Sequence, residues 1–388
     1  MALGIYIHIP YCIQRCSYCD FATYEQSKIM APEQYVNLLF KEIHSRQKFF
    51  KPQSLDTIYF GGGTPSLLPA HLIVSIINEL GRYGFTTRPD TEITIEINPA
   101  TVEPKKLDIY EGTGINRFSV GAQTFDDKLL KMVRREHSAQ QTLETLELLR
   151  SRNLNFSFDI LFALPGQTLE GLKKDVAIAI EQGAKHISPY CLTVPDGHPL
   201  SKGRAVDDEQ VEMFEVIAAE LTDHGFHQYE ISNFSLPGFE SRHNLLYWTD
   251  RPYWGIGLSA HSYSPDHKWG ARFWNINSIN EYEKQITTQA NQVIALESFP
   301  PEQVEFLEKH QALTDFCHTS LRLMKGLSIP DLRLKFDTDI LEKIERLSKP
   351  LEDKGLLEKL NDHWRLTAQG IVLSNKVFEV FTFLEEDL

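Results

Sequence analysis

The feature that most constrains the fold of this chain is a regular alternation of short strand-like runs and longer helical patterns. Six runs have the length and the apolar, partly alternating composition of β-strands; they cover residues 4–10, 56–60, 91–99, 115–121, 155–166 and 186–194. Helical patterns cover residues 33–43, 67–80, 126–152, 168–183 and 207–224. Strand–helix repetition with short connections predicts a parallel α/β architecture, either a barrel or a doubly wound sheet.

The connection after the first strand helps to choose between these architectures. No G-x-G-x-x-G motif opens a helix there, and this disfavours the doubly wound sheet that binds dinucleotides. A barrel is therefore favoured, and the doubly wound sheet stays the alternative. In such a barrel the carboxyl ends of the strands face a common mouth, so unusual residues at strand ends are candidates for a site.

The later part of the chain has a different composition. It becomes rich in aromatic residues and glycine after residue 235, then helical and charged from about residue 300. Two strand-like runs flank the turn Asn361–Asp362 and predict a β-wing. We expect a core barrel at 1–235, an extension at 236–295 and a helical, winged-helix-like domain at 296–388. Because acidic residues outnumber basic ones, packing or partner docking is favoured over DNA binding.

Charge and cysteine usage exclude several classes of protein. The 388 residues include 53 acidic and 39 basic side chains, a formal charge of −14, which argues against a nucleic-acid partner. The apolar N-terminal stretch lacks a basic region and is too short for a signal or an anchor, so any membrane contact is expected to be peripheral. Five cysteines do not suggest a disulfide framework, and a cytoplasmic location is expected.

Three of the cysteines lie close together. Cys12, Cys16 and Cys19 form a C-x3-C-x2-C pattern just after the first strand. Thiolates suit zinc or iron–sulfur clusters. A structural zinc site needs a fourth ligand, which Asp20 or a distant histidine would have to supply. Three thiolates on a four-iron cluster instead leave one iron open, and an open position is where a metal centre does chemistry. The spacing favours a cluster over zinc, and both over unliganded cysteines.

Polar residues follow several other predicted strands. The stretch GGGTPS (61–66) lets a ligand approach the backbone closely. Glu96, Gln123 and Asp159 lie at or near the ends of three further strands. Each alone is equally compatible with a buried structural polar group. Their repetition at successive strand ends predicts a site at the mouth of the barrel.

The cysteine spacing, with Tyr18 before the third cysteine, resembles the radical S-adenosylmethionine superfamily. In that superfamily the open iron binds the amino and carboxylate groups of S-adenosylmethionine, and an electron from the [4Fe-4S] cluster cleaves the sulfonium to a 5′-deoxyadenosyl radical. A closer resemblance is to the oxygen-independent coproporphyrinogen III oxidase-like family. The motifs YIHIPYC, FGGGTPS, EINP, SVGAQTFDD, DILFALPGQT and GIGLSAHSY carry it over residues 6–263, and the C-terminal module from about residue 300 is similar as well.

This resemblance implies a partial (β/α)6, TIM-like barrel and a set of site residues. Cys12, Cys16 and Cys19 would hold the cluster. Contacts to the cluster-bound S-adenosylmethionine are implied for Tyr6, Gly62, Glu96 and His261. A second S-adenosylmethionine site is implied for Tyr18, Gly63, Thr64, Gln123, Arg135, Asp159 and Cys191. Acids and an arginine suit a zwitterionic ligand, because charge-assisted hydrogen bonds orient its carboxylate and its amine.

Two departures from the oxidase pattern indicate a particular branch. The oxidase has a fourth cysteine where this chain has Phe21, and it has an extension before the first strand. The stretch RHNLLYW (242–248) instead resembles the H-N-x-x-Y-W signature of a haem-chaperone branch. That branch implies binding of haem and its transfer to acceptors such as respiratory haemoproteins, with a low-potential electron donor for the cluster.

The same signature implies a haem site. Imidazole is a common ligand of haem iron, so His243 is the first candidate, with His198, His261 and Cys191 as alternatives. Tyr247 and Trp248 are expected to line an apolar porphyrin slot, and Asn244 to anchor the loop or a propionate.

Two enzymatic functions compete with the chaperone. One is radical decarboxylation of coproporphyrinogen III to protoporphyrinogen IX, which Phe21 disfavours; the other is radical methyl transfer.

Overall fold

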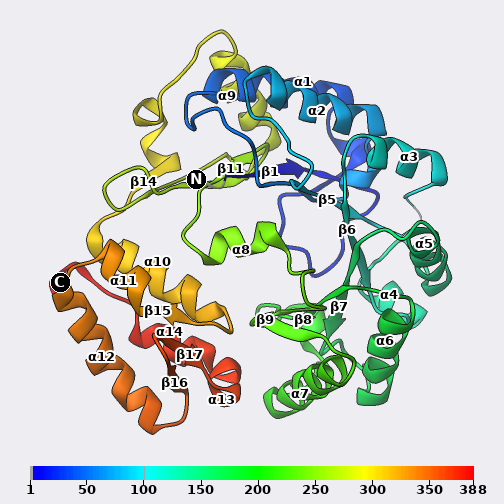
Figure 1. The fold of residues 1–388 in the computed structure, drawn as a ribbon. Helices are drawn as coiled ribbons and strands as arrows, with labels where there is room; N and C mark the ends of the chain where they lie inside the picture. Colours follow the sequence, from blue (N-terminus) through cyan, green and yellow to red (C-terminus); the bar gives the residue numbers. More distant parts are fainter. Residues whose placement is uncertain (1–2, 100) are drawn as a thin grey trace.

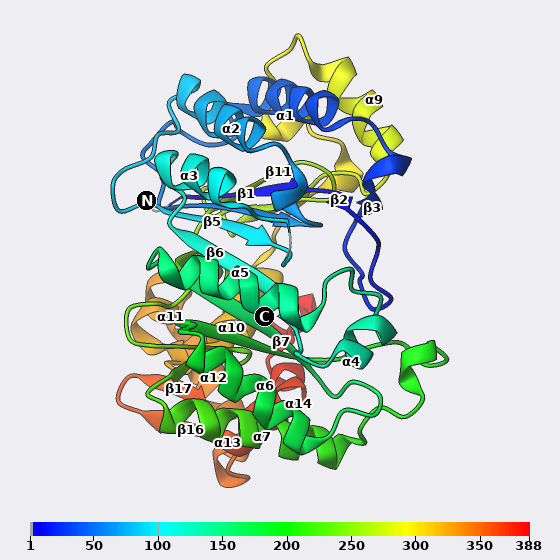
Figure 2. The same cartoon turned by 90° about the vertical axis from the view of Figure 1, so that its right-hand side faces the viewer.

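The computed structural model describes residues 3–99 and 101–388. Its framework is a strongly curved sheet whose central strands run parallel (Figures 1 and 2). The strand order β1-β4-β5-β6-β7-β8 contains the six barrel strands predicted from the sequence. Their bounds are β1 (Gly4–Ile9), β4 (Thr57–Gly62), β5 (Glu92–Ile97), β6 (Arg117–Gln123), β7 (Phe156–Phe162) and β8 (His186–Cys191). The expected partial barrel is confirmed.

Further strands extend the sheet at both edges, so that twelve strands pair in the described part of the chain and the barrel stays open. β11 (Tyr253–Ile256) adds to β1 in parallel and is followed by the antiparallel strands β12 (His261–Ser264), β13 (Ala271–Trp274) and β14 (Val304–Phe306). At the other edge β10 (Asn233–Ser235) and β9 (His227–Glu230) follow β8. A two-stranded pair, β2 (Tyr11–Cys12) and β3 (Tyr24–Glu25), closes the cysteine loop.

Helices cover the outer face of the sheet (Figure 2). Those that follow the barrel strands are α1 (Pro32–Arg46), α2 (Ala70–Arg82), α3 (Pro104–Gly112), α4 (Asp127–Met132), α5 (Ala139–Ser151), α6 (Leu169–Glu181) and α7 (Asp207–Asp223). The helix predicted at 33–43 is confirmed as α1, and its side chains Tyr35, Leu38, Leu39 and Ile43 are buried. Each such side chain stabilises the fold by about 1.5–3 kcal/mol.

The prediction of a single helix at 126–152 is wrong, because the two helices α4 and α5 occupy this stretch. The chain leaves the helical conformation at Arg134, whose φ of 58° lies in the left-handed region. Ser138 then begins α5 as its N-cap: its hydroxyl accepts from the amide of Gln141, whose side chain returns to the amide of Ser138. This capping box begins α5 in a register separate from that of α4. Arg135 therefore lies in a connection at the barrel mouth rather than on a helix.

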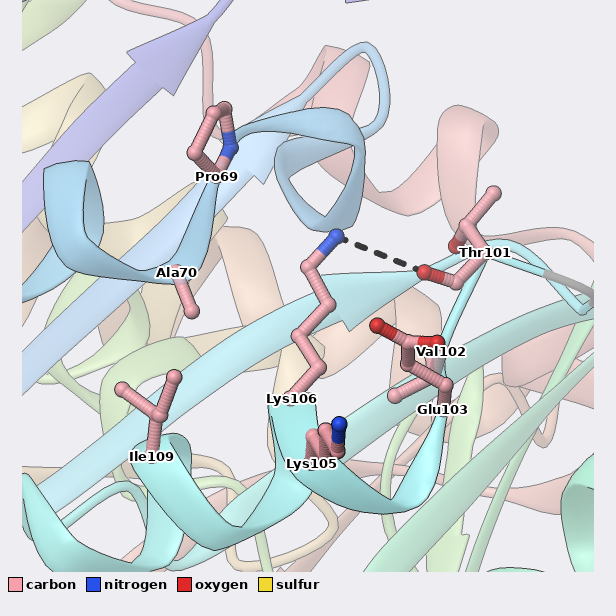
Figure 3. Close-up of a pocket in the computed structure, with 8 residues that line it drawn as sticks. All are labelled: Pro69, Ala70, Thr101, Val102, Glu103, Lys105, Lys106 and Ile109. Carbon is pink, nitrogen blue, oxygen red and sulfur yellow. Dashed lines mark hydrogen bonds between the residues drawn. The ribbon is translucent and has the colours of Figure 1, made fainter.

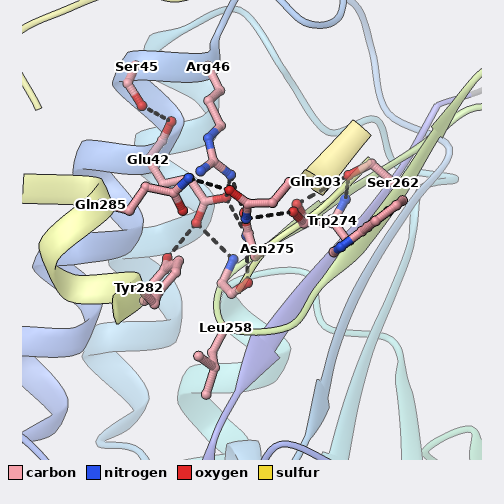
Figure 4. Close-up of polar contacts among 12 residues, drawn as sticks. Glu42, Ser45, Arg46, Leu258, Ser262, Trp274, Asn275, Tyr282, Gln285 and Gln303 are labelled. Atoms are coloured by element: carbon pink, nitrogen blue, oxygen red, sulfur yellow. Dashed lines mark hydrogen bonds and ion pairs between the residues drawn. The ribbon is translucent and has the colours of Figure 1, made fainter. Parts of the chain in front are cut away.

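A buried polar cluster joins α1 to the far edge of the sheet and to α9 (Ile279–Gln289) (Figure 4). The carboxylate of Glu42 is fully buried and pairs with Arg46 at 2.5 Å. It also accepts from the amide of Gly257 at 2.9 Å, from Nδ2 of Asn275 at 2.7 Å and from the hydroxyl of Tyr282 at 2.5 Å. A buried ion pair needs such additional donors to offset its desolvation, and here they tie together segments more than 200 residues apart.

The C-terminal module packs beside α8 (Arg242–Trp248), which lies between the sheet and the module (Figure 1). Its helices are α10 (Lys309–Arg322), α11 (Ile329–Lys335), α12 (Thr338–Asp353), α13 (Ala368–Val372) and α14 (Ser374–Val380). Its strands are β15 (Leu327–Ser328), β16 (Leu357–Leu360) and β17 (His363–Leu366), so the predicted wing is confirmed.

Two separate apolar cores occupy the two parts. The core of the large sheet ends at Phe299, and that of the module runs from Leu307 onward with Tyr263 added. The three-part division at residues 235 and 295 stays a prediction. None of the described helices is long and apolar enough to cross a bilayer.

Candidate functional site

A cavity of about 510 Å³ opens at the carboxyl ends of the barrel strands, and the three clustered cysteines line one side of it. All three are free thiols. Their loop is held in place by backbone contacts: the amide of Cys19 bonds the carbonyl of Cys16 at 3.3 Å, and the amide of Ser17 bonds Val133 at 3.2 Å. The second contact joins the loop to the connection between α4 and α5. The sequence cluster is thus a spatial cluster at the barrel mouth.

The chemistry of the three thiols suits an iron–sulfur cluster. Three thiols around one cavity fit a [4Fe-4S] cluster, because each thiolate then binds a different iron. Burial raises the pKa of the Cys12 thiol to about 11, so a bound metal, rather than the protein alone, would stabilise its thiolate.

The wall beside the cysteines is made of glycines and a buried acid. Gly62 has a φ of +110°, and a Cβ on Gly63 would lie 2.5 Å from the backbone carbonyl of Tyr11. The backbone at these positions therefore admits only glycine. The Glu96 carboxylate accepts from the amide of Gly62 at 3.1 Å and from the hydroxyl of Tyr59 at 2.8 Å. Burial raises the pKa of Glu96 to about 7.

Arg135 brings a positive charge to the cysteines. Its guanidinium donates to the sulfur of Cys16 at 3.5 Å and to the carbonyl of Gly121, while its buried Nε has no partner among the described residues. Asp159 also lines the cavity, and burial raises the pKa of its carboxyl to about 6. Gln123, another lining residue, ends β6 with a φ of 73°, at a register shift against β7. A cation, two acids and an unpaired N–H around one space can orient a zwitterionic ligand.

Most residues predicted for the cluster and for S-adenosylmethionine line this one cavity. They are Cys12, Cys16, Tyr18, Cys19, Gly62, Gly63, Thr64, Glu96, Gln123, Arg135, Asp159 and Cys191. Asn244 of the H-N-x-x-Y-W signature lines it too. Tyr6 and His261 do not; they line a smaller neighbouring cavity of about 350 Å³. The roles of all these residues stay predictions, but the structure separates the last two from the rest.

Sequence reasoning missed several inward-facing residues of β6, β7 and β8. The cavity is also lined by Arg117, Ser119, Ser157, His186, Ser188 and Tyr190. Their signal was the alternation of small polar residues within apolar strands, since every second residue of a strand faces the barrel interior. The hydroxyls of Ser119 and Ser157 bond each other at 3.1 Å.

The helix α8 holds the H-N-x-x-Y-W signature, and its histidine is buried. Glu92 accepts from the amides of Arg242 and His243, at 3.1 and 3.0 Å, and thereby anchors the first turn. The His243 ring bonds Thr57 Oγ1 at 2.7 Å through Nδ1 and the Tyr247 hydroxyl at 2.8 Å through Nε2. Burial lowers the pKa of His243 to about 3, so the ring is neutral.

The predicted haem contacts of this signature stay predictions. A neutral imidazole has one N–H and one lone pair, and both ring nitrogens of His243 have hydrogen-bond partners. Iron ligation by His243 would require one of these hydrogen bonds to be exchanged for the iron. Trp248 lines neither cavity; Arg322 covers its ring at 4.5 Å. His198 bonds the carbonyl of Ser17 at 3.0 Å and supports the cysteine loop.

A third cavity, of about 360 Å³, lies beside α3 (Figure 3). Lys106 projects into it, but its ammonium donates to the carbonyls of Ser66 and Thr101. The cavity contains no cysteine or histidine. The half-buried ammonium of Lys106 is thus already hydrogen-bonded, and the cysteine cavity remains the candidate site.

Comparison with known protein families identifies the superfamily of the barrel and of the C-terminal module. A family model for the Radical SAM superfamily matches residues 6–178, and one for the HemN C-terminal domain matches residues 307–373. Coproporphyrinogen III oxidase (HemN) from Escherichia coli, described as a radical SAM enzyme, superimposes with a TM-score of 0.82 at 22% identity, covering 98% of this chain and 90% of that one. The fold and the matched domain define the chain as a radical SAM protein.

Sequence identity to curated relatives shows which family within the superfamily the chain belongs to. Heme chaperone HemW from Bacillus subtilis is 33% identical over 388 residues, covering 97% of this chain and 98% of the relative. Heme chaperone HemW from Synechocystis is 34% identical, covering 100% and 98%, and that from Escherichia coli K12 is 30% identical, covering 98% of each. The chain belongs to the HemW family.

Proposed function

We propose that this chain is a haem chaperone, which binds haem and passes it to acceptor haemoproteins. The observation that carries the proposal is similarity over the whole length to relatives named as heme chaperones. Phe21 supports it, because a phenylalanine occupies the position at which the oxidase pattern has its fourth cysteine. Respiratory haemoproteins are the acceptor class that we propose.

The proposal includes a [4Fe-4S] cluster held by Cys12, Cys16 and Cys19, with S-adenosylmethionine beside it. When bound, the cluster supplies a low-potential electron and an iron with an open position. The protein groups around it bind and orient the ligand. Glu96 accepts from the ligand's ammonium, and the spare N–H of Arg135 donates to a carboxylate. Burial strengthens both contacts by lowering the local dielectric.

One experiment tests this function against its enzymatic competitors. The cluster is reconstituted under anaerobic conditions, and the same preparation is divided between a haem titration and an assay for coproporphyrinogen III with S-adenosylmethionine and a reductant. We expect stoichiometric haem binding and no protoporphyrinogen IX. Turnover to protoporphyrinogen IX at enzymatic rates would replace the chaperone by the decarboxylase, and a methylated product would replace it by a methyltransferase.

Transfer is tested separately with an apo-acceptor haemoprotein. We expect the acceptor's haem spectrum to grow at the expense of the spectrum of the loaded chain. The matched control is free haem at the same concentration, which must load the acceptor more slowly. Equal rates with and without the chain would contradict a chaperone role.

A further inference from the structure

The cysteine cavity continues from the mouth of the barrel to the beginnings of β6 and β8. Arg117 is the first residue of β6 and His186 the first residue of β8, and both line the cavity. Cys191, at the other end of β8, lines it as well. Because β8 has 6 residues, its two ends lie about 16 Å apart. The cavity therefore has an inner end that is separate from the groups at its mouth.

The guanidinium of Arg117 is buried at this inner end without a counter-ion. The residue is 2% exposed, and its Nη1 donates to the carbonyl of Phe239 at 3.1 Å. No carboxylate of the described residues lies within ion-pair distance of it. Asp159 lines the same cavity, but Arg135 lowers the pKa of its carboxyl more than Arg117 does. A buried charge is costly without a partner, so Arg117 is suited to pair with a ligand.

The neighbouring ring of His186 has an unused N–H. Its Nε2 bonds the Tyr229 hydroxyl at 2.8 Å, and the oxygen of that hydroxyl accepts from the amide of Ser241 at 3.4 Å. The tyrosine hydrogen is thus directed at Nε2. Burial and the charge of Arg117 lower the pKa of His186 well below its usual value, so the ring is neutral and has its single N–H at Nδ1. That nitrogen is buried and has no partner among the described residues.

A third polar group reaches the inner end from α8. The hydrogen bond between Tyr229 and Ser241 places the beginning of α8 beside His186. Asn244 lies one turn further on, where its backbone amide bonds Ser241 Oγ at 3.3 Å. Its side chain lines the cavity, and its carboxamide has no hydrogen-bond partner within the described part of the chain. Three elements far apart in the sequence thus bring three groups with unused donors to one space.

We propose that the inner end of the cysteine cavity, defined by Arg117, His186 and Asn244, binds the carboxylate of a small organic acid. The guanidinium supplies the opposite charge, and the imidazole N–H and the carboxamide supply neutral hydrogen bonds. The S-adenosylmethionine proposed above has its carboxylate at the mouth, beside the cysteines and Arg135. The acid is therefore a second molecule, held in the barrel by residues that the proposed function does not use.

The charges around the cavity favour a carboxylate over a phosphate. The pKa of Asp159 is about 6, so its carboxyl is mostly ionised at neutral pH and repels an anion in the same cavity. A dianion such as phosphate meets twice the repulsion that a monocarboxylate meets. The planar guanidinium of Arg117 also matches the two oxygens of a carboxylate.

The test uses propionate as the probe and propionamide, its neutral counterpart of nearly equal size, as the control ligand. Binding to the reconstituted full chain is followed by saturation-transfer NMR at constant ionic strength. We expect propionate to bind at least about tenfold more tightly than propionamide, because the amide lacks the charge. We expect inorganic phosphate to bind more weakly than propionate. Equal binding of propionate and propionamide, tighter binding of phosphate, or no binding of propionate would each overturn the inference.

Arg117→Met removes the guanidinium and keeps a side chain of similar length. We expect at least about tenfold weaker propionate binding, and loss of the rise in melting temperature that propionate gives the wild type. Arg134→Met is the matched control, since this exposed arginine lines the cavity at its mouth; it should bind propionate like the wild type. Unchanged binding in Arg117→Met, or an equal loss in both variants, would overturn the assignment.

A measurement on the unsubstituted chain covers the case in which Arg117→Met does not fold. With ¹⁵N-labelled histidine, the Nδ1–H signal of His186 is identified by its absence from His186→Phe. We expect this signal to move as propionate is added, because Nδ1 gains an acceptor. A signal that stays in place at saturating propionate would overturn the role of His186 and the placement of the acid.

S-adenosylmethionine shows whether the two ends of the cavity are separate sites. We expect the affinity for propionate to change less than about twofold when S-adenosylmethionine is present at saturation. Displacement of propionate would overturn the inference, because both ligands would then share the mouth, and it would leave the proposed function standing. Failure of the chain to bind haem would overturn the proposed function and leave the acid site standing.

Discussion

The buried carboxyl of Glu96 makes the stability of the cluster-free chain depend on pH. Its pKa rises from the ordinary 4.5 to about 7 because burial disfavours the charged form. Between these two values the folded chain keeps a proton that the unfolded chain releases. Rising pH therefore favours the unfolded state, and the stability contribution of the neutral carboxyl is lost as the pH increases from 4.5 to 7.

The size of the effect follows from the shift. About 2.5 pKa units correspond to about 3 kcal/mol, at about 1.4 kcal/mol per unit. Glu96→Gln has no proton to lose and keeps an acceptor for Gly62 or Tyr59. The difference in unfolding free energy between the wild type and Glu96→Gln should thus fall by up to about 3 kcal/mol as the pH rises from 4.5 to 7.5.

Urea unfolding at a series of pH values, followed by circular dichroism, measures this difference. Glu103→Gln, at an exposed acid on the outer side of the barrel, is the matched control and should show a flat difference. A flat difference for Glu96→Gln as well would refute the argument, because it would show that the folded carboxyl titrates at its ordinary pKa. S-adenosylmethionine should weaken the pH dependence, since its ammonium stabilises the carboxylate.

Three further perturbations test other parts of the structure. Cys16→Ser should abolish the cluster, measured as bound iron, sulfide and visible absorbance, whereas Cys191→Ser should retain it; equal cluster content in both would contradict the ligand assignment. Glu42→Ala leaves the guanidinium of Arg46 without its ion-pair partner in the core. It should lower the unfolding free energy by about 3–5 kcal/mol. A loss below about 1 kcal/mol, measured by urea unfolding, would argue against a stabilising ion pair. Gly63→Ala places a Cβ against a backbone carbonyl at 2.5 Å and should lower the melting temperature and the affinity for S-adenosylmethionine, whereas Gly81→Ala, whose Cβ meets nothing within 4 Å, should do neither.

Much of the fold was predictable from the sequence because it depends on local patterns. Apolar periodicity over about five to fifteen residues predicts strands and helices. The six barrel strands, α1 and the C-terminal wing all show this periodicity. The cysteine cluster was predictable for the same reason, since three ligands within eight positions come from one loop. The helix break before Arg135 was missed, because its cap residues lie inside a continuous helical pattern.

The orientation of single side chains was decided by tertiary structure. The ring of His243 forms a hydrogen bond with Thr57, which is 186 residues away in the sequence. The carboxylate of Glu92 accepts from the amide of His243 and anchors the helix. Neither partner is visible from the H-N-x-x-Y-W signature. The strand register likewise pairs His261 with Trp274 and places it, with Tyr6, in a cavity apart from the cysteines.

By itself, the sequence determined the barrel, the cysteine cluster and most of the ring of polar residues at its mouth. Only the tertiary structure decided which histidine nitrogens have hydrogen-bond partners and which of two cavities each residue lines. The physical reason is that periodicity and ligand spacing are local properties of the chain, whereas a free lone pair depends on every group that packs around it.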